Sequence, residues 1–186
     1  MKRLLATAVV AALAFSFATE GQDKPPEKSA TEIGEMILLT IPAKAYFASP
    51  IETDFKTMGE PIVKKLTAMQ SAAKDIQLVL TGPVVHVYEK APHRNPEKPF
   101  KMRTGWFAPD GLKKVGPYPV QELPKFRCAT LIYIGPGSQI GEAWQRLYRA
   151  ALDKGLELTG EERELTLYWE AVDSPNNIVQ VQVGVK

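Results

Sequence analysis

Two short segments, 84–89 and 164–170, contain the side chains of this sequence that are best suited to chemistry. Both are predicted to be β-strands, because valine, leucine, threonine and tyrosine dominate them. The polar side chains assigned to one face of these strands are His86, Tyr88, Thr166, Tyr168 and Glu170. A carboxylate or an imidazole can act as a general base, and a carboxylate among aromatic rings can hold a cation. The two segments therefore predict either a binding site or a hydrolytic site.

Alternation along the two strands separates this polar set from an apolar set on the opposite face. The apolar set consists of Val85, Val87, Leu165, Leu167 and Trp169. We expect helices to cover the apolar face, and the polar face to form a groove where the two strands lie side by side. Tyrosine and threonine are also ordinary strand residues, so an unoccupied sheet face explains the alternation equally well.

Single residues can be ranked as site candidates by their position. Glu170 is the first choice for a ligand-binding or catalytic carboxylate, with a solvated strand end as the alternative. Trp106, beside a glycine, is expected to form a wall of the groove, whereas Trp144 lies on a helical apolar stripe and is expected in the core. His93, in a proline-rich loop, and Glu89, at a strand end, are expected to be exposed.

Motifs of the established catalytic and phosphate-binding classes are missing from the sequence, including nucleophile elbows, zinc-protease helices and phosphate loops. The turn 135–137 precedes a helix, but Pro136 removes one amide, and an ordinary turn explains it. Two histidines and one cysteine do not make a convincing metal centre. We therefore predict no metal and no cofactor.

The elements that must position these residues follow from hydrophobic periodicity and turn residues. The order strand, helix, strand, strand is predicted twice, in halves of about 36–110 and 125–186. The predicted strands are 36–41 and 43–47 with a break at Pro42, 84–89, 100–108 with Gly105 as a bulge, 127–134, 164–170 and 178–185, and the helices are 55–73 and 140–151. Asp54 or a later start near Pro61 can begin the first helix, and Ser138 is expected to cap the second. The predicted fold is α+β: two pseudo-symmetric β-α-β-β repeats in one antiparallel sheet, with both helices on one face and a ligand groove on the other.

The N-terminal segment is predicted to direct export. Lys2 and Arg3 precede an apolar run that ends in Ser16-Phe17-Ala18, which is the pattern of a secretory signal peptide over residues 1–18. The run is shorter than the roughly 20 residues of a membrane helix, although an uncleaved anchor is the alternative. Residues 19–35 are predicted to be a disordered leader, and 36–186 the folded domain.

Composition and charge narrow the classes of partner. With 186 residues, 45% hydrophobic and 24% charged, the chain has the balance of a globular protein that can bury a core. Of 23 basic residues, Lys2 and Arg3 fall in the signal peptide, so the mature chain has as many basic as acidic residues, 21 of each. A formal charge of zero argues against a nucleic-acid partner. We expect a small-molecule partner, no stable membrane insertion after cleavage, and a monomer or weak dimer.

An ordered set of short matches resembles the GyrI-like small-molecule-binding domain, also called the effector-binding domain of AraC-type activators. In the second half the matches are Ala129-Thr130, Gly135-Pro-Gly137, Ala143-Trp144 with Leu147-Tyr148, Gly155-Leu156, Tyr168 and the final alternating strand. In the first half they are Ile41-Pro-Ala43, Gly82-Pro83 before Tyr88, and Leu123-Pro124. The resemblance covers the chain from Met36 onward and implies two β-α-β-β units around a central ligand groove.

The sequence departs from that family in two ways. Regulators of the family carry a DNA-reading helix-turn-helix before this domain, whereas here only the signal peptide and leader precede it, so transcriptional control is not expected. Ligand-binding members place a glutamate two residues before the tyrosine, a position that holds Thr166 here, with Glu170 as the nearest carboxylate on that face.

Four functions remain open after the resemblance. The favoured one is an exported protein that binds an aromatic or amphipathic ligand, with cationic ligands included, through Tyr88, His86, Trp106, Thr166, Tyr168 and Glu170. The family also implies a hydrolase of reactive cyclopropane-bearing compounds, with Glu170 as general base and Tyr168 as a positioning donor. A related haem-binding family implies His86 as an iron ligand. The fourth is a structural or partner-binding envelope protein.

Overall fold

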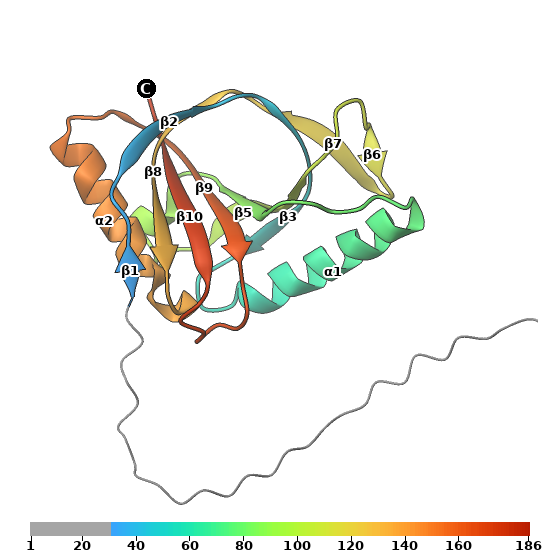
Figure 1. Ribbon diagram of the computed structural model, residues 1–186, viewed down its shortest axis with the longest axis horizontal. Helices are drawn as coiled ribbons and strands as arrows, with labels where there is room; N and C mark the ends of the chain where they lie inside the picture. The colour runs from blue at the N-terminus through green and yellow to red at the C-terminus, as the bar shows by residue number, and fades with distance from the viewer. Residues whose placement is uncertain (1–30) are drawn as a thin grey trace, which may run out of the picture.

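The computed structural model describes residues 31–186, which form a 10-stranded sheet and two α-helices (Figure 1). The expected signal peptide, and the leader up to residue 30, lie outside the described residues. The strands are β1 (Glu32–Ile33), β2 (Ile37–Ile41), β3 (Lys44–Thr53), β4 (Val84–Tyr88), β5 (Phe100–Phe107), β6 (Lys114–Val115), β7 (Tyr118–Leu123), β8 (Phe126–Ile134), β9 (Leu158–Tyr168) and β10 (Ile178–Val185). The helices are α1 (Gly59–Asp75) and α2 (Ile140–Asp153), with short 3₁₀ turns η1 (Pro92–Arg94) and η2 (Gly137–Gln139).

The strands pair antiparallel in the order β1-β8-β10-β9-β4-β5-β3-β7-β6, with β2 also on β8. The order strand, helix, strand, strand occurs twice, as β3-α1-β4-β5 and as β8-α2-β9-β10. The predicted α+β class with a mainly antiparallel sheet is therefore confirmed, while the pseudo-symmetry of the halves stays a prediction. Strands β9 and β4 join the two sets at the centre of the sheet.

The sheet curves, because two short connections, β2–β3 and β7–β8, join strands that lie toward opposite ends of it. Strand β2 pairs with β8, yet only Pro42 and Ala43 separate it from β3, which pairs with β5 and β7. Likewise, β7 and β8 are separated only by Pro124 and Lys125. Figure 1 shows the β2–β3 stretch arching over the centre of the molecule. The sheet face inside this arch has its own small core of Tyr46, Val85, Val87 and Leu123.

Both helices pack on the other face of the sheet. The predicted stripe of α2 is confirmed, since Ala143, Trp144, Leu147, Tyr148 and Ala151 are all buried. Helix α1 begins at Gly59, so Pro61 lies in its first turn, where its missing N–H costs nothing. Asp54 closes the turn before that helix, where its Oδ1 accepts hydrogen bonds from the N–H groups of Lys56 (2.8 Å) and Thr57 (2.9 Å).

Four local predictions were wrong. Gly105 is not a bulge: it pairs in regular register with Ala48, and a Cβ there would lie 2.0 Å from the carbonyl oxygen of Phe47, so only glycine fits. Strand pairing begins at Glu32, inside the expected leader. Ser138 lies in η2 and does not cap α2. Strand β9 begins at Leu158, six residues earlier than predicted, which decides the position of the site.

Within residues 31–186, no helix has the length and apolar character needed to span a membrane.

Candidate functional site

Two glutamates of strand β9, Glu162 and Glu164, lie buried at the centre of the sheet with 0% and 9% of their surface exposed. They point to the same face because they alternate along the strand. Val183 and Val181 of β10 pair with them on one side, and Tyr88 and His86 of β4 on the other. Helix α2 covers this face with Trp144 and Tyr148. Buried carboxyls are rare unless partners compensate for the lost water, so the surroundings of these two decide what the site can do.

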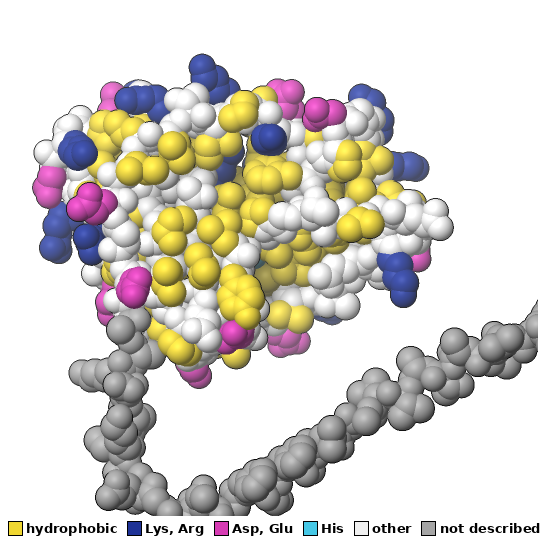
Figure 2. Space-filling model, in the orientation of Figure 1, with side chains coloured by type: hydrophobic (Ala, Val, Ile, Leu, Met, Phe, Trp, Pro, Cys, Tyr) yellow, Lys and Arg dark blue, Asp and Glu magenta, His cyan; other side chains and the backbone are white. Residues whose placement is uncertain are grey.

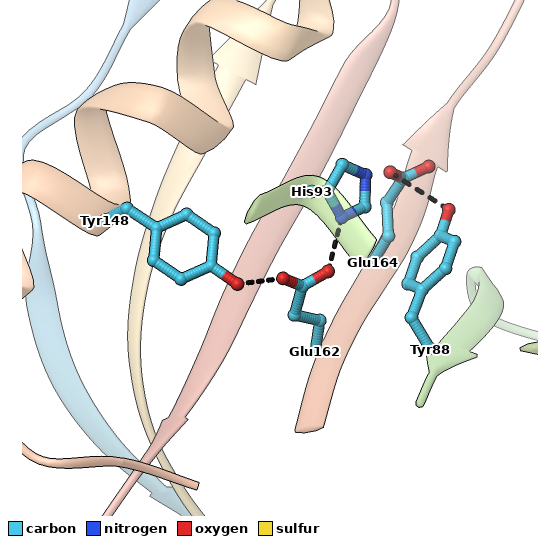
Figure 3. A network of polar contacts seen from close by, with 5 residues as sticks. All are labelled: Tyr88, His93, Tyr148, Glu162 and Glu164. Carbon is cyan, nitrogen blue, oxygen red and sulfur yellow. Dashed lines mark hydrogen bonds and ion pairs between the residues drawn. The ribbon is translucent and has the colours of Figure 1, made fainter. Parts of the chain in front are cut away.

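Glu162 is held by two side chains from different elements (Figure 3). The Tyr148 hydroxyl of α2 donates a hydrogen bond to its Oε1. The Nδ1 atom of His93, in η1, contacts its Oε2, and the His93 side chain is only 7% exposed. Burial lowers the pKa of His93, and the hydrogen bond and charge of Glu162 act in the opposite direction. The prediction that His93 is exposed was therefore wrong: the proline-rich loop folds it into the site.

The carboxyl of Glu164 has weaker hydrogen bonds than that of Glu162. The Tyr88 hydroxyl donates a long hydrogen bond of 3.5 Å to Glu164 Oε2. The Trp144 indole faces the Glu164 carboxyl without a hydrogen bond of ordinary geometry. Burial raises the pKa of Glu164 to about 7, and the nearby charge of Glu162 adds to this effect. Glu164 is thus a carboxyl that gains and loses its proton near neutral pH, as a general acid or base requires.

Aromatic rings enclose the carboxyl pair. The His93 ring stacks on Trp144 with 3.8 Å between centroids and 12° between planes. Phe55 lies 4.6 Å and Tyr88 4.9 Å from the His93 centroid, and Phe100 packs against both of those rings. Of two surface hollows of about 280 and 290 Å³, the second borders the cluster at Tyr88, but neither is lined by Glu162 or Glu164. In this structure the aromatic and acidic side chains therefore form a closed cluster, which we call the Glu162–Glu164 cluster.

His86 and Tyr88 are the members of the sequence-predicted set that reach this cluster. Their rings lie 6.3 Å apart, and both are buried. Burial lowers the pKa of His86 to about 4, so its ring is neutral at physiological pH. Its Nδ1 atom has no hydrogen-bond partner in the described part of the chain. His86 lines neither of the two hollows, so the geometry gives the haem alternative no support.

Tyr168 and Glu170 do not join the cluster, contrary to the shared groove predicted for them with Tyr88. Tyr88 pairs with Glu162, and Tyr168 lies six residues farther along the strand, about 20 Å away at 3.3 Å per residue. The register between β9 and β10 shifts at Leu167. This shift interrupts the alternation of side chains on which the prediction depended. Both side chains are exposed, and the Tyr168 hydroxyl donates a 2.7 Å hydrogen bond to Glu170. Hydrogen bonds from Ser174, Tyr168 and Asn176 lower the pKa of Glu170, so it is an ordinary exposed carboxylate.

The other predicted site residues also lie apart from the cluster. Trp106 is buried beneath α1 and stacks on Phe47, with 6.0 Å between ring centroids. Thr166 pairs with Val84 at the far end of β4 and is half-buried. The face was also assigned wrongly, since Tyr88 lies under the helices, and Val85 and Val87 lie on the opposite face, in the small core inside the arch. Figure 2 shows that hydrophobic side chains also gather on the molecular surface over β8, β9 and β10.

Glu162 was missed because the predicted strand began only at residue 164, and Glu164 was missed because the polar face was counted only from Thr166 onward. The stretch 158–163 was left outside the predicted strand. Its sequence, Leu-Thr-Gly-Glu-Glu-Arg, has low β-propensity. Alternation counted backward from Thr166 would have found Glu164 and then Glu162 on the face of Tyr88. Among residues 31–186, no group of His, Cys, Asp and Glu is placed to hold a metal ion, and the chemistry available here is that of acids among aromatic rings.

Comparisons with known proteins agree with this fold. The GyrI-like small molecule binding domain model matches residues 34–186. No functionally curated protein matches the sequence. The fold is similar to that of the EcmrR C-terminal domain, with a TM-score of 0.66 and 20% identity over 82% of this chain and 98% of that one. Of the EcmrR chain in a complex with DNA, this chain covers 57%, with 20% identity and a TM-score of 0.65.

Two further solved structures share the fold at lower identity. A hydrolase from Listeria innocua has a TM-score of 0.60 and 11% identity over 82% of this chain and 92% of its own. SAV2435 bound to tetraphenylphosphonium has a TM-score of 0.56 and 10% identity over 82% of this chain and 94% of its own.

Proposed function

The chain belongs to the GyrI-like small-molecule-binding domain family, and we propose that it binds an aromatic, positively charged small molecule at the Glu162–Glu164 cluster. The observation that carries this proposal is the charge balance of the cluster. Two buried carboxyls lie among aromatic rings, and within residues 31–186 His93 is the one basic side chain in hydrogen-bond contact with either of them. A cation supplies the missing charge, and ring faces attract it as well.

Structural relatives support a cationic ligand as a class. SAV2435 was solved with tetraphenylphosphonium, a lipophilic aromatic cation. We infer that this chain accepts ligands of that character, because it combines the same fold with buried acids and the rings of Tyr88, Trp144 and Tyr148. The ring faces would contact the apolar body of the ligand, and the carboxyls would neutralise its charge.

Calorimetric titration of tetraphenylphosphonium tests this proposal. We expect binding by the wild-type chain and affinity at least tenfold weaker in Glu162→Gln and Glu164→Gln, because each variant keeps the shape and removes an acid. Glu170→Gln is the matched control: it removes the same charge from an exposed site and is expected to leave affinity unchanged. Loss of binding in Glu170→Gln with full binding in the two cluster variants would instead assign the site to the exposed strand end.

We also propose that the protein acts outside the cytoplasm, as a monomer or weak dimer. Support for export comes from the sequence alone, in the basic start and short apolar run of residues 1–18. Expression in a bacterium, followed by fractionation and N-terminal sequencing, tests it. We expect an exported chain that begins at Thr19, whereas an intact N-terminus in the cytoplasm contradicts the proposal.

Hydrolysis of a reactive small molecule is a second candidate, because one cluster carboxyl has the pKa of a base at neutral pH. Glu164, with a pKa raised to about 7, lies 3.5 Å from the Tyr88 hydroxyl, so it could take a proton from water while Tyr88 positions the substrate. The hydrolase from Listeria innocua has the same fold. The test is incubation with a cyclopropane-bearing compound. A hydrolysed product formed by the wild-type chain and absent with Glu164→Gln supports turnover, whereas a compound recovered intact from the complex rejects it.

A further inference from the structure

His93 occupies the position in the Glu162–Glu164 cluster that best suits a ligand. Its ring is flat and polar, it stacks on Trp144, and its Nδ1 contacts the carboxyl of Glu162. Phe55 and Tyr88 close the remaining sides at 4.6 and 4.9 Å between centroids. Figure 3 shows His93 and Tyr148 meeting the two oxygens of Glu162 from different elements. A stacked ring with an N–H directed at a buried acid is the arrangement expected of a bound heteroaromatic cation.

The segment that supplies His93 is attached to the rest of the fold by few backbone contacts. Its last links are hydrogen bonds from the N–H of Glu89 to Lys101 and from the N–H of Ala91 to Gly160, at 3.1 and 2.8 Å. From Pro92 to Lys98, the described backbone hydrogen bonds stay within the segment. Residues 94–99 are exposed. His93 can therefore leave the cluster without breaking a sheet or helix hydrogen bond.

The backbone before His93 is in a conformation that favours release. Lys90 and Ala91 both have left-handed torsions, with φ of 60° and 49°, although neither is glycine. Such residues each cost about 1 kcal/mol and persist only where surrounding contacts hold them. This turn is held by the hydrogen bonds of Glu89 and Ala91, by the burial of Ala91 and by the packing of His93. The segment thus has a strained start and an exposed end, with His93 as its anchor.

We propose that His93 is an internal surrogate ligand, and that the site takes a flat cation bearing N–H groups, such as an imidazolium or amidinium, which displaces His93. This inference rests on the proposed function and narrows its ligand class. The incoming cation takes over the stacking on Trp144 and the hydrogen bond to Glu162, and residues 92–99 move outward, while the hydrogen bonds of Glu89 and Ala91 to the sheet stay in place. Groups facing the ring from each packed element are Glu162 from β9, Trp144 from α2, Tyr88 from β4 and Phe55 before α1.

Two measurements on the full-length chain test the inference. In His93→Gly, free imidazole should fill the vacated space, and its affinity should exceed that for the wild-type chain by about ten- to a hundredfold, the range of one charge-assisted hydrogen bond. Adding Glu162→Gln to this variant should abolish the gain. A folded His93→Gly that binds imidazole no better than the wild-type chain overturns the inference.

The second measurement needs no variant. The chain has only two histidines, so the ring signals of His93 can be followed by NMR while benzamidinium, a flat aromatic cation with N–H donors, is added. We expect the His93 signals to shift from a buried to a solvated environment while those of His86 stay in place. Unchanged His93 signals at saturating benzamidinium overturn the inference. This result is decisive even if the His93→Gly variant of the first experiment does not fold.

The two proposals can fail separately. If tetraphenylphosphonium binds the cluster of the wild-type chain while His93 stays in place, the proposed function stands and the surrogate-ligand inference falls. If imidazole fills His93→Gly but tetraphenylphosphonium does not bind the wild-type chain, the role of His93 stands and the broader ligand class is wrong.

Discussion

Replacing Glu164 by glutamine should make the protein more stable at alkaline pH, although the change removes a buried polar contact from the centre of the sheet. The pKa of Glu164 is about 7 in the folded chain, against 4.5 for an unperturbed glutamate. At about 1.4 kcal/mol per pKa unit, ionisation of this carboxyl costs the folded state about 3 kcal/mol above pH 7. Glutamine has a similar shape, accepts the hydrogen bond from Tyr88 and never ionises, so it avoids this cost.

The sign follows from proton linkage. Between pH 4.5 and 7 the folded state binds more protons at Glu164 than the unfolded state does, so this group lowers stability as pH rises. His86 acts in the opposite direction, because its pKa falls from 6.5 to about 4 on folding, and stability at this group rises over that window. His93 is shifted in the same direction as His86. The wild-type chain should therefore show a flattened pH profile, in which the glutamate and histidine effects offset each other.

The assay is urea unfolding of both chains from pH 4 to pH 8, followed by circular dichroism. The difference in free energy of unfolding between Glu164→Gln and wild type should grow by about 3 kcal/mol over this range. Glu52→Gln is the control, since it removes a carboxylate from an exposed position on β3. Parallel profiles for Glu164→Gln and wild type would refute the reasoning, because they would mean that Glu164 titrates as an exposed glutamate does.

Two further substitutions test the packing around the site by denaturant unfolding. Gly105→Ala should cost about 3 kcal/mol or more, because the added Cβ would lie 2.0 Å from a backbone oxygen of β3. Gly141→Ala, on exposed α2 surface with nothing within 4 Å, should leave stability unchanged or raise it by up to about 1 kcal/mol, and equal effects at both glycines would contradict the close approach. Tyr148→Phe should cost about 1.5–3 kcal/mol, because it removes the hydroxyl that donates to the buried Glu162. Tyr168→Phe removes an exposed hydrogen bond and should change stability by less than about 0.5 kcal/mol, so similar losses in the two tyrosine variants would be evidence against a buried network.

Local patterns were sufficient for most of the secondary structure. The stripe of α2 and the alternation of β10 were predicted correctly, because each depends on residues close together in sequence. Local patterns failed where a distant strand decided the outcome. Gly105 is fixed by the backbone of β3, and β9 extends over polar residues because β10 and β4 supply its hydrogen bonds.

The positions of the candidate site residues were predicted only in part. Tyr88 and His86 were named correctly as members of one polar face, and Tyr88 proved to contact the cluster acid Glu164. The acid was predicted at the wrong end of the strand. Glu170 was chosen as the partner of Tyr88, whereas Glu164 and Glu162 are the acids that lie beside it. The alternation rule was sound up to Leu167, where the register shift ends its validity.

By itself, the sequence determined the α+β class, the family and the strand that carries the site, because periodicity and turn residues act through neighbours in the chain. Only the tertiary structure decided which acids are buried, which face the helices cover and that His93 enters the cluster. The physical reason is that burial and pKa depend on what β4, β9, η1 and α2 bring together, and 69 residues separate His93 from Glu162.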